Sequence, residues 1–172
     1  TVPLPFHTGR KPYEQIAFQY SHHIYYQDGR IEHTNQYINS TAGEFPNFEF
    51  VESLKQALSK DEGTIFKFAT HENTILNAIR AQLKASAPPN KESLISFIES
   101  ISHPTKDNPD QWTVPTRRFN QGTRDMVDLC KVVVKYYYNP HTFGSNSIKK
   151  VLPAVLKSSQ FVQEKYSKPI GA

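Results

Sequence analysis

The sequence predicts a mixed fold of helices and strands, of the α/β or α+β class. Two alternating stretches joined by a turn pair come first and predict a β-hairpin. A helix–strand–helix pattern follows, and helical spacing returns in the C-terminal third. The chain has 172 residues, of which 37% are hydrophobic. Because domains typically have about 100–200 residues, we expect residues 1–172 to form a single domain.

The hairpin is predicted by a local pattern. Residues 15–26 alternate, with aliphatic and aromatic side chains on one side of the expected strand. Asp28 and Gly29 follow, a pair that readily adopts the positive φ angles of a tight turn. We expect the partner strand over residues 31–38. This places two paired strands at the start of the domain.

Two adjacent histidines, His22 and His23, lie in the middle of the first expected strand. Successive side chains of a strand point to opposite faces, so the two rings cannot bind one metal ion together. We expect one of them to be half-buried in the core.

Three apolar stripes predict three helices between residues 47 and 101, with Asn47, Thr70 and Asn90 as N-caps. A short strand over residues 64–69 separates the first helix from the second. The apolar positions of the three stripes are Phe48, Val51, Leu54, Leu58, Ile75, Leu76, Ile79, Leu83, Leu94, Ile95, Ile98 and Ile101.

The C-terminal part begins with a proline-containing stretch, residues 102–122, which we expect to be a long exposed loop. Helical spacing over residues 125–138 predicts a further helix. Ser145 or Ser147 can then cap a helical run over residues 148–152.

A proline comes directly after that run. Pro153 can occupy the first turn of a following helix but not the middle of a long one. A last amphipathic helix is expected over residues 159–166.

Charge is distributed unevenly along the chain. Residues 1–86 carry 8 basic and 9 acidic side chains, whereas residues 87–172 carry 12 and 7. A basic half can form a phosphate-binding face, and it is equally what a solvated surface looks like. The longest aliphatic run, residues 132–134, is far shorter than the roughly 20 residues that span a bilayer, so no membrane partner is expected. The single cysteine, Cys130, excludes an internal disulfide and favours a cytoplasmic protein.

Two carboxylates are candidates for chemistry. Glu72 follows the short strand and opens a helix, where open α/β sheets collect ligands, although a glutamate there also suits the helix dipole. Asp128 lies among apolar residues, so its charge needs a hydrogen bond, a cation or a metal. Carboxylates converging from different elements suit Mg²⁺ or Mn²⁺. The phosphate-binding loop, dinucleotide-binding and zinc-protease signatures are absent from the sequence.

A tyrosine run ending at Tyr138 precedes the basic pair Lys149 and Lys150. Aromatic faces can stack on bases, and lysines can hold phosphates, which indicates nucleic-acid binding. The alternative is a helix whose aromatics fill the core while the lysines face water.

Several phrases resemble a known family: residues 9–21, 69–74, 126–129, 136–138 and 145–153. In this order they resemble an uncharacterised bacterial domain-of-unknown-function family. That family looks like a branch of the DnaQ-like 3′–5′ exonucleases, which have a ribonuclease-H-like fold.

The resemblance implies a set of site residues. Glu72 matches the acidic position after a strand, and Asp128 matches an aspartate that members carry after the long loop. Both are expected to be catalytic ligands of Mg²⁺ or Mn²⁺. His71, Tyr138, Lys149 and Lys150 are expected to contact DNA or RNA.

The resemblance also implies missing parts. Members open with an Asp-Phe-Glu-Thr strand just before the segment matching residues 1–11, and a late acidic motif would follow residue 172. We therefore expect this chain to be an excised part of a longer protein whose sheet lacks its first central strand. The exposed sheet edge would favour a homodimer. The expected function is that of an inactive fragment of a metal-dependent nuclease; the alternative is a non-catalytic nucleic-acid-binding or protein-docking module.

Overall fold

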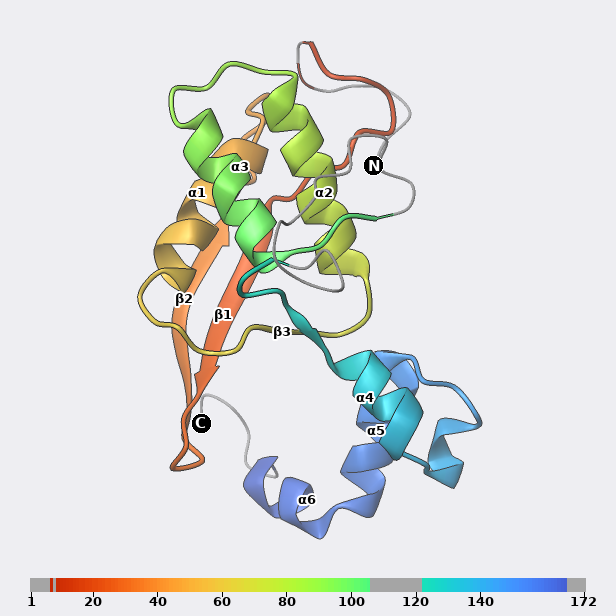
Figure 1. Cartoon of the computed structure of the whole chain (residues 1–172). Coiled ribbons are helices and arrows are strands. Elements are labelled where there is room, and N and C mark those ends of the chain that lie inside the picture. The colour runs from red at the N-terminus through yellow and green to blue at the C-terminus, as the bar shows by residue number, and fades with distance from the viewer. Residues whose placement is uncertain (1–6, 8, 106–121, 167–172) are drawn as a thin grey trace. The chain divides into compact units, whose positions relative to one another are not determined.

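The computed structural model describes residues 7, 9–105 and 122–166. They form two compact units. We call residues up to 65 together with 71–126 the N-terminal unit, and residues 66–70 together with those from 127 onward the C-terminal unit. The described ranges contain an antiparallel hairpin, a small parallel sheet and six α-helices (Figure 1). The predicted mixed α/β class is therefore confirmed.

The N-terminal unit opens with the hairpin of strands β1 (Gln19–Tyr25) and β2 (Ile31–Ile38). The turn at Asp28-Gly29 is confirmed, because Gly29 has a φ of +83° and the Asp28 carboxylate accepts a hydrogen bond from the Arg30 amide at 2.9 Å. The strand β1 begins later than the alternation does. A bulge between His22 and His23 shifts the register, so that His23 pairs with His33.

Three helices pack together beside the hairpin, and α1 also packs on both of its strands (Figure 1). Their apolar stripes meet as predicted, and Val51, Ile79 and Ile98 have no exposed surface. Burial of this kind stabilises the fold by about 1.5–3 kcal/mol for each large aliphatic side chain. The helices are α1 (Asn47–Leu58), α2 (His71–Lys84) and α3 (Lys91–Ile101).

The predicted cap at Asn47 is wrong, because Pro46 takes the N-cap position of α1. Asn47 is instead fully buried. Its Oδ1 accepts a hydrogen bond from the Ala17 amide at 2.8 Å, and its Nδ2 donates to the Gln15 carbonyl at 2.9 Å and to Gln82 Oε1 at 2.6 Å. The side chain therefore links the chain before β1 to α1 and α2.

The chain re-enters the described range at Gly122, which is buried against the end of α3. The Gly122 amide donates to the Ser102 carbonyl at 3.0 Å, and the Arg124 amide donates to the Ser100 carbonyl at 2.7 Å. A Cβ atom on Gly122 would lie 2.3 Å from the Ser100 carbonyl oxygen. Only glycine permits this close approach. Residues 106–121, most of the predicted exposed loop, lie outside the described residues.

The C-terminal unit begins with two parallel strands of two residues each, β3 (Phe66–Lys67) and β4 (Val127–Asp128). The predicted helix over residues 125–138 starts too early. Asp128 caps the helix by accepting a hydrogen bond from the Cys130 amide, and the residues before it extend as β4. The elements that follow are α4 (Leu129–Tyr136), a short 3₁₀ helix (Pro140–Thr142), α5 (Ile148–Ser158) and α6 (Gln160–Tyr166).

The prediction for Pro153 is also wrong, since this proline lies inside α5. Proline removes only one backbone donor there, and both Lys149 and Pro153 are exposed, so water can satisfy the freed carbonyl of Lys149. Ser147 takes the N-cap position of α5 as predicted. None of the helices in the described ranges is both long and apolar enough to span a bilayer.

Candidate functional site

The helix α2 presents two of the predicted site residues at its N-terminus. His71 is its first residue and Glu72 lies in its first turn, and both side chains are exposed. The next residue, Asn73, is buried and turns the other way. The Glu72 carboxylate is therefore open to solvent at a helix start, where the positive end of the helix dipole stabilises negative charge.

Asp128 has hydrogen-bond partners in its own unit. Its Oδ1 accepts from the Ala69 amide and from the Cys130 amide, both at 2.9 Å. Ala69 has a φ of +69°, which is strained for a residue with a Cβ and costs about 1–2 kcal/mol. Asp128 therefore holds the strained residue that ends the β3 segment, three residues before Glu72 in the chain.

These carboxylates do not complete a metal centre by themselves. The ranges that the structure describes contain no cluster of three or more His, Cys, Asp and Glu side chains able to hold an ion. One oxygen of Asp128 is already committed to two backbone donors. Each of these carboxylates is therefore at most part of a site for Mg²⁺ or Mn²⁺, which take about six oxygen ligands.

The C-terminal unit exposes three of the four predicted nucleic-acid-binding residues; the fourth, His71, lies in the N-terminal unit. Tyr138 is 89% exposed and Phe143 is 83% exposed, although aromatic rings are costly to leave in water. Lys149 and Lys150 are exposed in the first turn of α5, and Lys150 Nζ lies 5.9 Å from the centre of the Phe143 ring.

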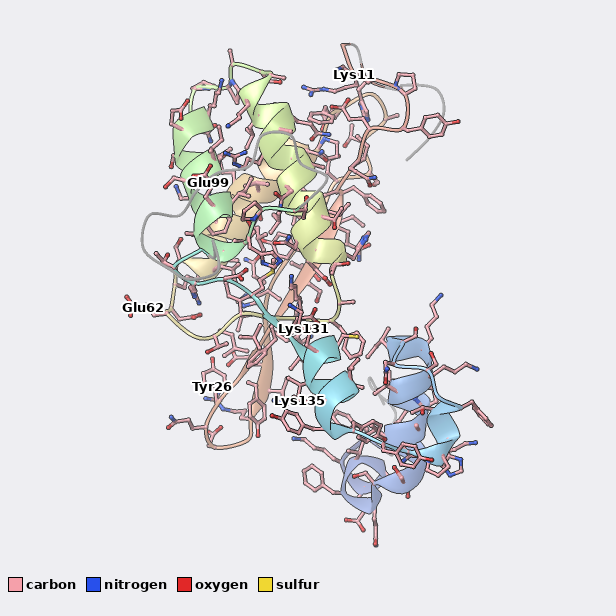
Figure 2. The ribbon with its side chains drawn as sticks, turned by 45° about the vertical axis from the view of Figure 1, so that its right-hand side comes forward. Lys11, Tyr26, Glu62, Glu99, Lys131 and Lys135 are labelled. Carbon is pink, nitrogen blue, oxygen red and sulfur yellow. The ribbon has the colours of Figure 1, made fainter. Side chains whose placement is uncertain are left out.

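Two further lysines of this unit are exposed. Lys131 and Lys135 are exposed on α4 (Figure 2), and Lys135 Nζ lies 4.9 Å from the centre of the Tyr136 ring. Sequence reasoning missed these two residues, although a lysine four residues before another is a helical spacing. From residue 127 to residue 166 the chain carries six lysines and two carboxylates, a net charge of +4. We call the exposed lysines and aromatic rings of these residues the basic aromatic surface.

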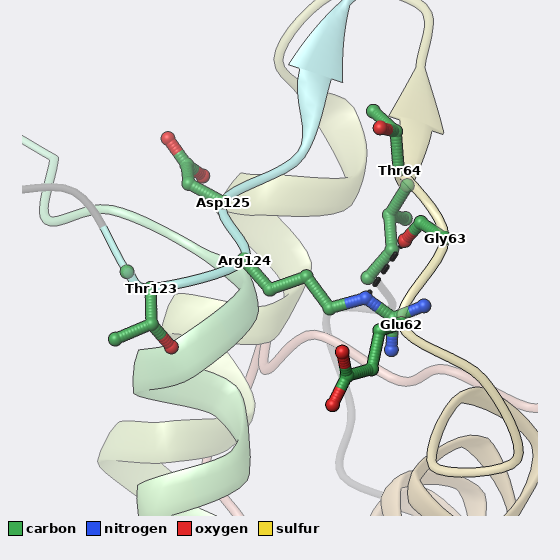
Figure 3. Close-up of a pocket in the computed structure, with 8 residues that line it drawn as sticks. Glu62, Gly63, Thr64, Thr123, Arg124 and Asp125 are labelled. Atoms are coloured by element: carbon green, nitrogen blue, oxygen red, sulfur yellow. Dashed lines mark hydrogen bonds between the residues drawn. The ribbon is translucent and has the colours of Figure 1, made fainter.

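A polar cavity of about 300 Å³ lies within the N-terminal unit between residues 62–65 and 122–125 (Figure 3). The Arg124 guanidinium reaches across it: Nε donates to the Gly63 carbonyl at 2.8 Å, and Nη2 bonds Asp61 at 2.7 Å. The Arg124 guanidinium, which is the positive charge of the cavity, thus joins the two walls of the cavity through these bonds. None of the residues that the sequence singled out lines it.

The sequence analysis also missed a histidine–aspartate pair. His103 Nδ1 lies 3.0 Å from each carboxylate oxygen of Asp125, and the aspartate side chain is only 7% exposed. The His103 backbone is held by Asn73, which accepts from its amide and donates to its carbonyl, and by Asn77. No local pattern announces a pair separated by 22 residues. The pair fixes the chain after α3 to the chain before β4.

Burial and hydrogen bonding shift the pKa values of His22 and Tyr37 in the hairpin. Burial lowers the pKa of His22 below its usual 6.5, with the nearby Asp61 opposing the shift. Burial and the hydrogen bond to Glu49 raise the pKa of Tyr37 to about 12. Both groups are half-buried on the inner face of the hairpin, as predicted for one of the two adjacent histidines.

The sequence was compared with known proteins. No curated protein and no solved structure matches it. A family match covers most of the chain and ends at residue 147, so α5 with Lys149 and Lys150 lies beyond it. The chain belongs to the family described as domain of unknown function DUF2779, which it matches over residues 1–147.

Proposed function

We propose that this chain binds single-stranded nucleic acid through the basic aromatic surface, as the substrate-holding part of a metal-dependent nuclease. The observation that carries the proposal is the exposure of Tyr138, which is 89%. A nearly free tyrosine ring contributes little to folding, but it can stack on a base, because every base has a π-face.

Electrostatics supports the same partner. The residues from 127 to 166 carry a net charge of +4; Lys149 and Lys150 are exposed, and Lys150 lies beside Phe143. A surface that alternates lysines with aromatic rings can contact phosphates and bases of one strand at the same time. A duplex would hide its base faces from these rings, and so single strands are the favoured ligand.

The nuclease part of the proposal rests on the resemblance to DnaQ-like exonucleases and includes their ribonuclease-H-like fold. Glu72 and Asp128 would supply oxygen ligands to Mg²⁺ or Mn²⁺, which polarises a phosphodiester when bound. The position of Glu72 in the first turn of α2, after the strand β3, supports its part in this set. Since the two carboxylates supply at most part of a metal site, we expect little or no cleavage by this chain alone.

Fluorescence anisotropy with labelled single-stranded DNA and RNA tests the binding. We expect Tyr138→Ala to weaken binding about fivefold or more, since base–aromatic stacking contributes about 1–3 kcal/mol. Tyr25→Ala is the matched control, because Tyr25 is 71% exposed and lies on the hairpin. Equal affinity of the Tyr138 variant and the unaltered chain would refute the stacking role.

A cleavage assay in Mn²⁺ or Mg²⁺ tests the chemistry, with the chain extended by the residues that flank it in its natural protein. Glu72→Gln should abolish cleavage because it removes a charged ligand. Glu92→Gln is the control, since Glu92 is also an exposed glutamate in the first turn of a helix, α3. Cleavage that persists in the Glu72 variant excludes this residue as a ligand.

The second candidate function is a non-catalytic module that binds nucleic acid or docks a protein. Commitment of Asp128 to two backbone amides favours it. Oligonucleotide binding that needs no divalent ion, together with no cleavage by the extended chain, would identify the nucleic-acid-binding module. Lack of any oligonucleotide binding at low salt would instead identify a protein-docking domain.

We also propose that the chain forms a homodimer and is located in the cytoplasm. The hairpin is a two-stranded sheet in the described ranges, so each of its strands has one edge without a neighbouring strand there. Such edges favour pairing with a second chain. A monomer by light scattering at high protein concentration would exclude the dimer.

A further inference from the structure

We propose that the hairpin carries a transition-metal site formed by His23 and His33. The two residues are partners in the register of β1 and β2, and both side chains are exposed. Their ring centres are 4.9 Å apart with an angle of 39° between the planes. The pair lies on the outer face of the hairpin and uses none of the residues assigned to the proposed function.

The separation of the rings fits one shared ion. Imidazole nitrogens lie about 2.0–2.1 Å from bound zinc, and two of them at a tetrahedral angle place their ring centres about 5 Å apart. The observed 4.9 Å is close to this separation. Two rings placed in advance on a paired backbone lose little conformational freedom when an ion binds, which favours binding.

The bulge of the hairpin creates this pair. Asn35 pairs with His22 and His33 pairs with His23, so Thr34 is the extra residue of β2. The Thr34 hydroxyl lies 3.0 Å from His22 Nδ1. Bulges redirect side chains and are common beside functional sites. Without this bulge, the residue facing His23 would be Thr34, which offers no imidazole.

The chemistry of the ligands selects the metal. Neutral imidazole prefers Ni²⁺, Cu²⁺ and Zn²⁺, whereas Mg²⁺ prefers oxygen ligands. Ser21 and Gln36, the next pair on the outer face, are exposed, and water can complete the coordination of the ion. The site therefore prefers a different ion from the Mg²⁺ or Mn²⁺ of the proposed nuclease, which are bound through oxygen ligands.

Isothermal titration calorimetry of the untagged full chain with Ni²⁺, Zn²⁺ and Mg²⁺ at pH 7.5 tests the site. We expect one Ni²⁺ or Zn²⁺ per chain and no heat from Mg²⁺ beyond dilution. His23→Ala and His33→Ala should each weaken Ni²⁺ binding at least about tenfold, because even groups that only orient ligands cost tenfold or more. His141→Ala is the matched control, since His141 is an exposed histidine of the C-terminal unit.

Circular dichroism establishes that each variant is folded, and both hairpin histidines are exposed, so their loss leaves the core intact. Unchanged Ni²⁺ affinity in His33→Ala would overturn the proposal, because groups other than the His23–His33 pair would then be the ligands. Equal weakening in His141→Ala would overturn it too, as would the absence of Ni²⁺ binding up to millimolar concentration.

Discussion

Single side chains stabilise the N-terminal unit through contacts that cannot be predicted from their residue type. Asn47 is buried and bonds three groups from two other segments of the chain. A buried donor or acceptor left without a partner costs about 1–3 kcal/mol. The polar network around Asn47 is therefore as important for stability as an apolar contact of the core.

We expect Asn47→Ala to lower the free energy of unfolding by about 2–3 kcal/mol, because the Ala17 amide and Gln82 Oε1 would each lose a buried partner. Urea denaturation followed by circular dichroism measures the change. Asn146→Ala is the control, since Asn146 is exposed and its loss should change stability by less than about 0.5 kcal/mol. A similar small change in the Asn47 variant would show that water replaces the lost bonds.

Tyr37 makes the stability of the folded chain depend on pH under alkaline conditions. Its pKa is raised to about 12 in the folded chain, against about 10 when unfolded. Between these values the unfolded chain releases the phenol proton while the folded chain keeps it, so stability falls as the pH rises from 10 to 12. Thermal denaturation at pH 9 and pH 11 should show a smaller loss in Tyr37→Phe than in the unaltered chain. An identical loss in both would assign the alkaline effect to other groups.

At the scale of residues, the sequence predicted what is periodic. Of the twelve apolar positions predicted for α1, α2 and α3, nine are buried and three, Phe48, Leu54 and Ile75, are partly buried against the same core. Asn47 was misread as a cap because its partner, the Gln15 carbonyl, is 32 residues away. His103 and Asp125 were missed for the same reason, since pairing across a fold leaves no local pattern.

The ends of a helix or strand could be predicted where a local rule in the sequence determines them. The hairpin has such a rule in the Asp28-Gly29 turn, and β2 has the predicted bounds. The start of α4 has none, because Asp128 faces Lys67 in a parallel pair and bonds Ala69, both about sixty residues earlier. Long-range pairing thus converted the start of a predicted helix into a strand.

The return of the chain to α3 depends on one glycine. We expect Gly122→Ala to lower the free energy of unfolding by about 2 kcal/mol, because the new Cβ would overlap the Ser100 carbonyl and the backbone would have to shift. Thr123→Ala, at the exposed neighbouring residue, is the control. Chemical denaturation compares the two, and equal stability would mean that the end of α3 yields without cost.

For the molecule as a whole, the sequence shows where basic residues concentrate but not what they bind. In residues 127–166, lysines are exposed, and two of them lie near aromatic rings. The roles of Glu72, Asp128, His71, Tyr138 and the lysine pair stay predictions. Chemistry at these positions depends on ligands and substrates, which no pattern of burial supplies.

The salt dependence of oligonucleotide binding tests how the charged surface is used. Each phosphate contact to a single strand contributes about 0.7 to the slope of log K against log salt. Replacing Lys149 and Lys150 together by alanine should reduce the slope by about 1.4. Replacing Lys11 and Lys60, exposed lysines of the N-terminal unit, should leave it unchanged. Equal slopes for the two double variants would show that Lys149 and Lys150 do not contact the phosphates.

The bond from the Ala17 amide to Asn47 has a consequence for motion. The Ala17 amide precedes β1, yet its acceptor is fully buried and is held in turn by α2 through Gln82. Deuterium can replace this proton only when the helices separate from the segment before β1. Ala17 should therefore exchange as slowly as amides in the middle of α2, and it reports the opening of the N-terminal unit from outside any regular element.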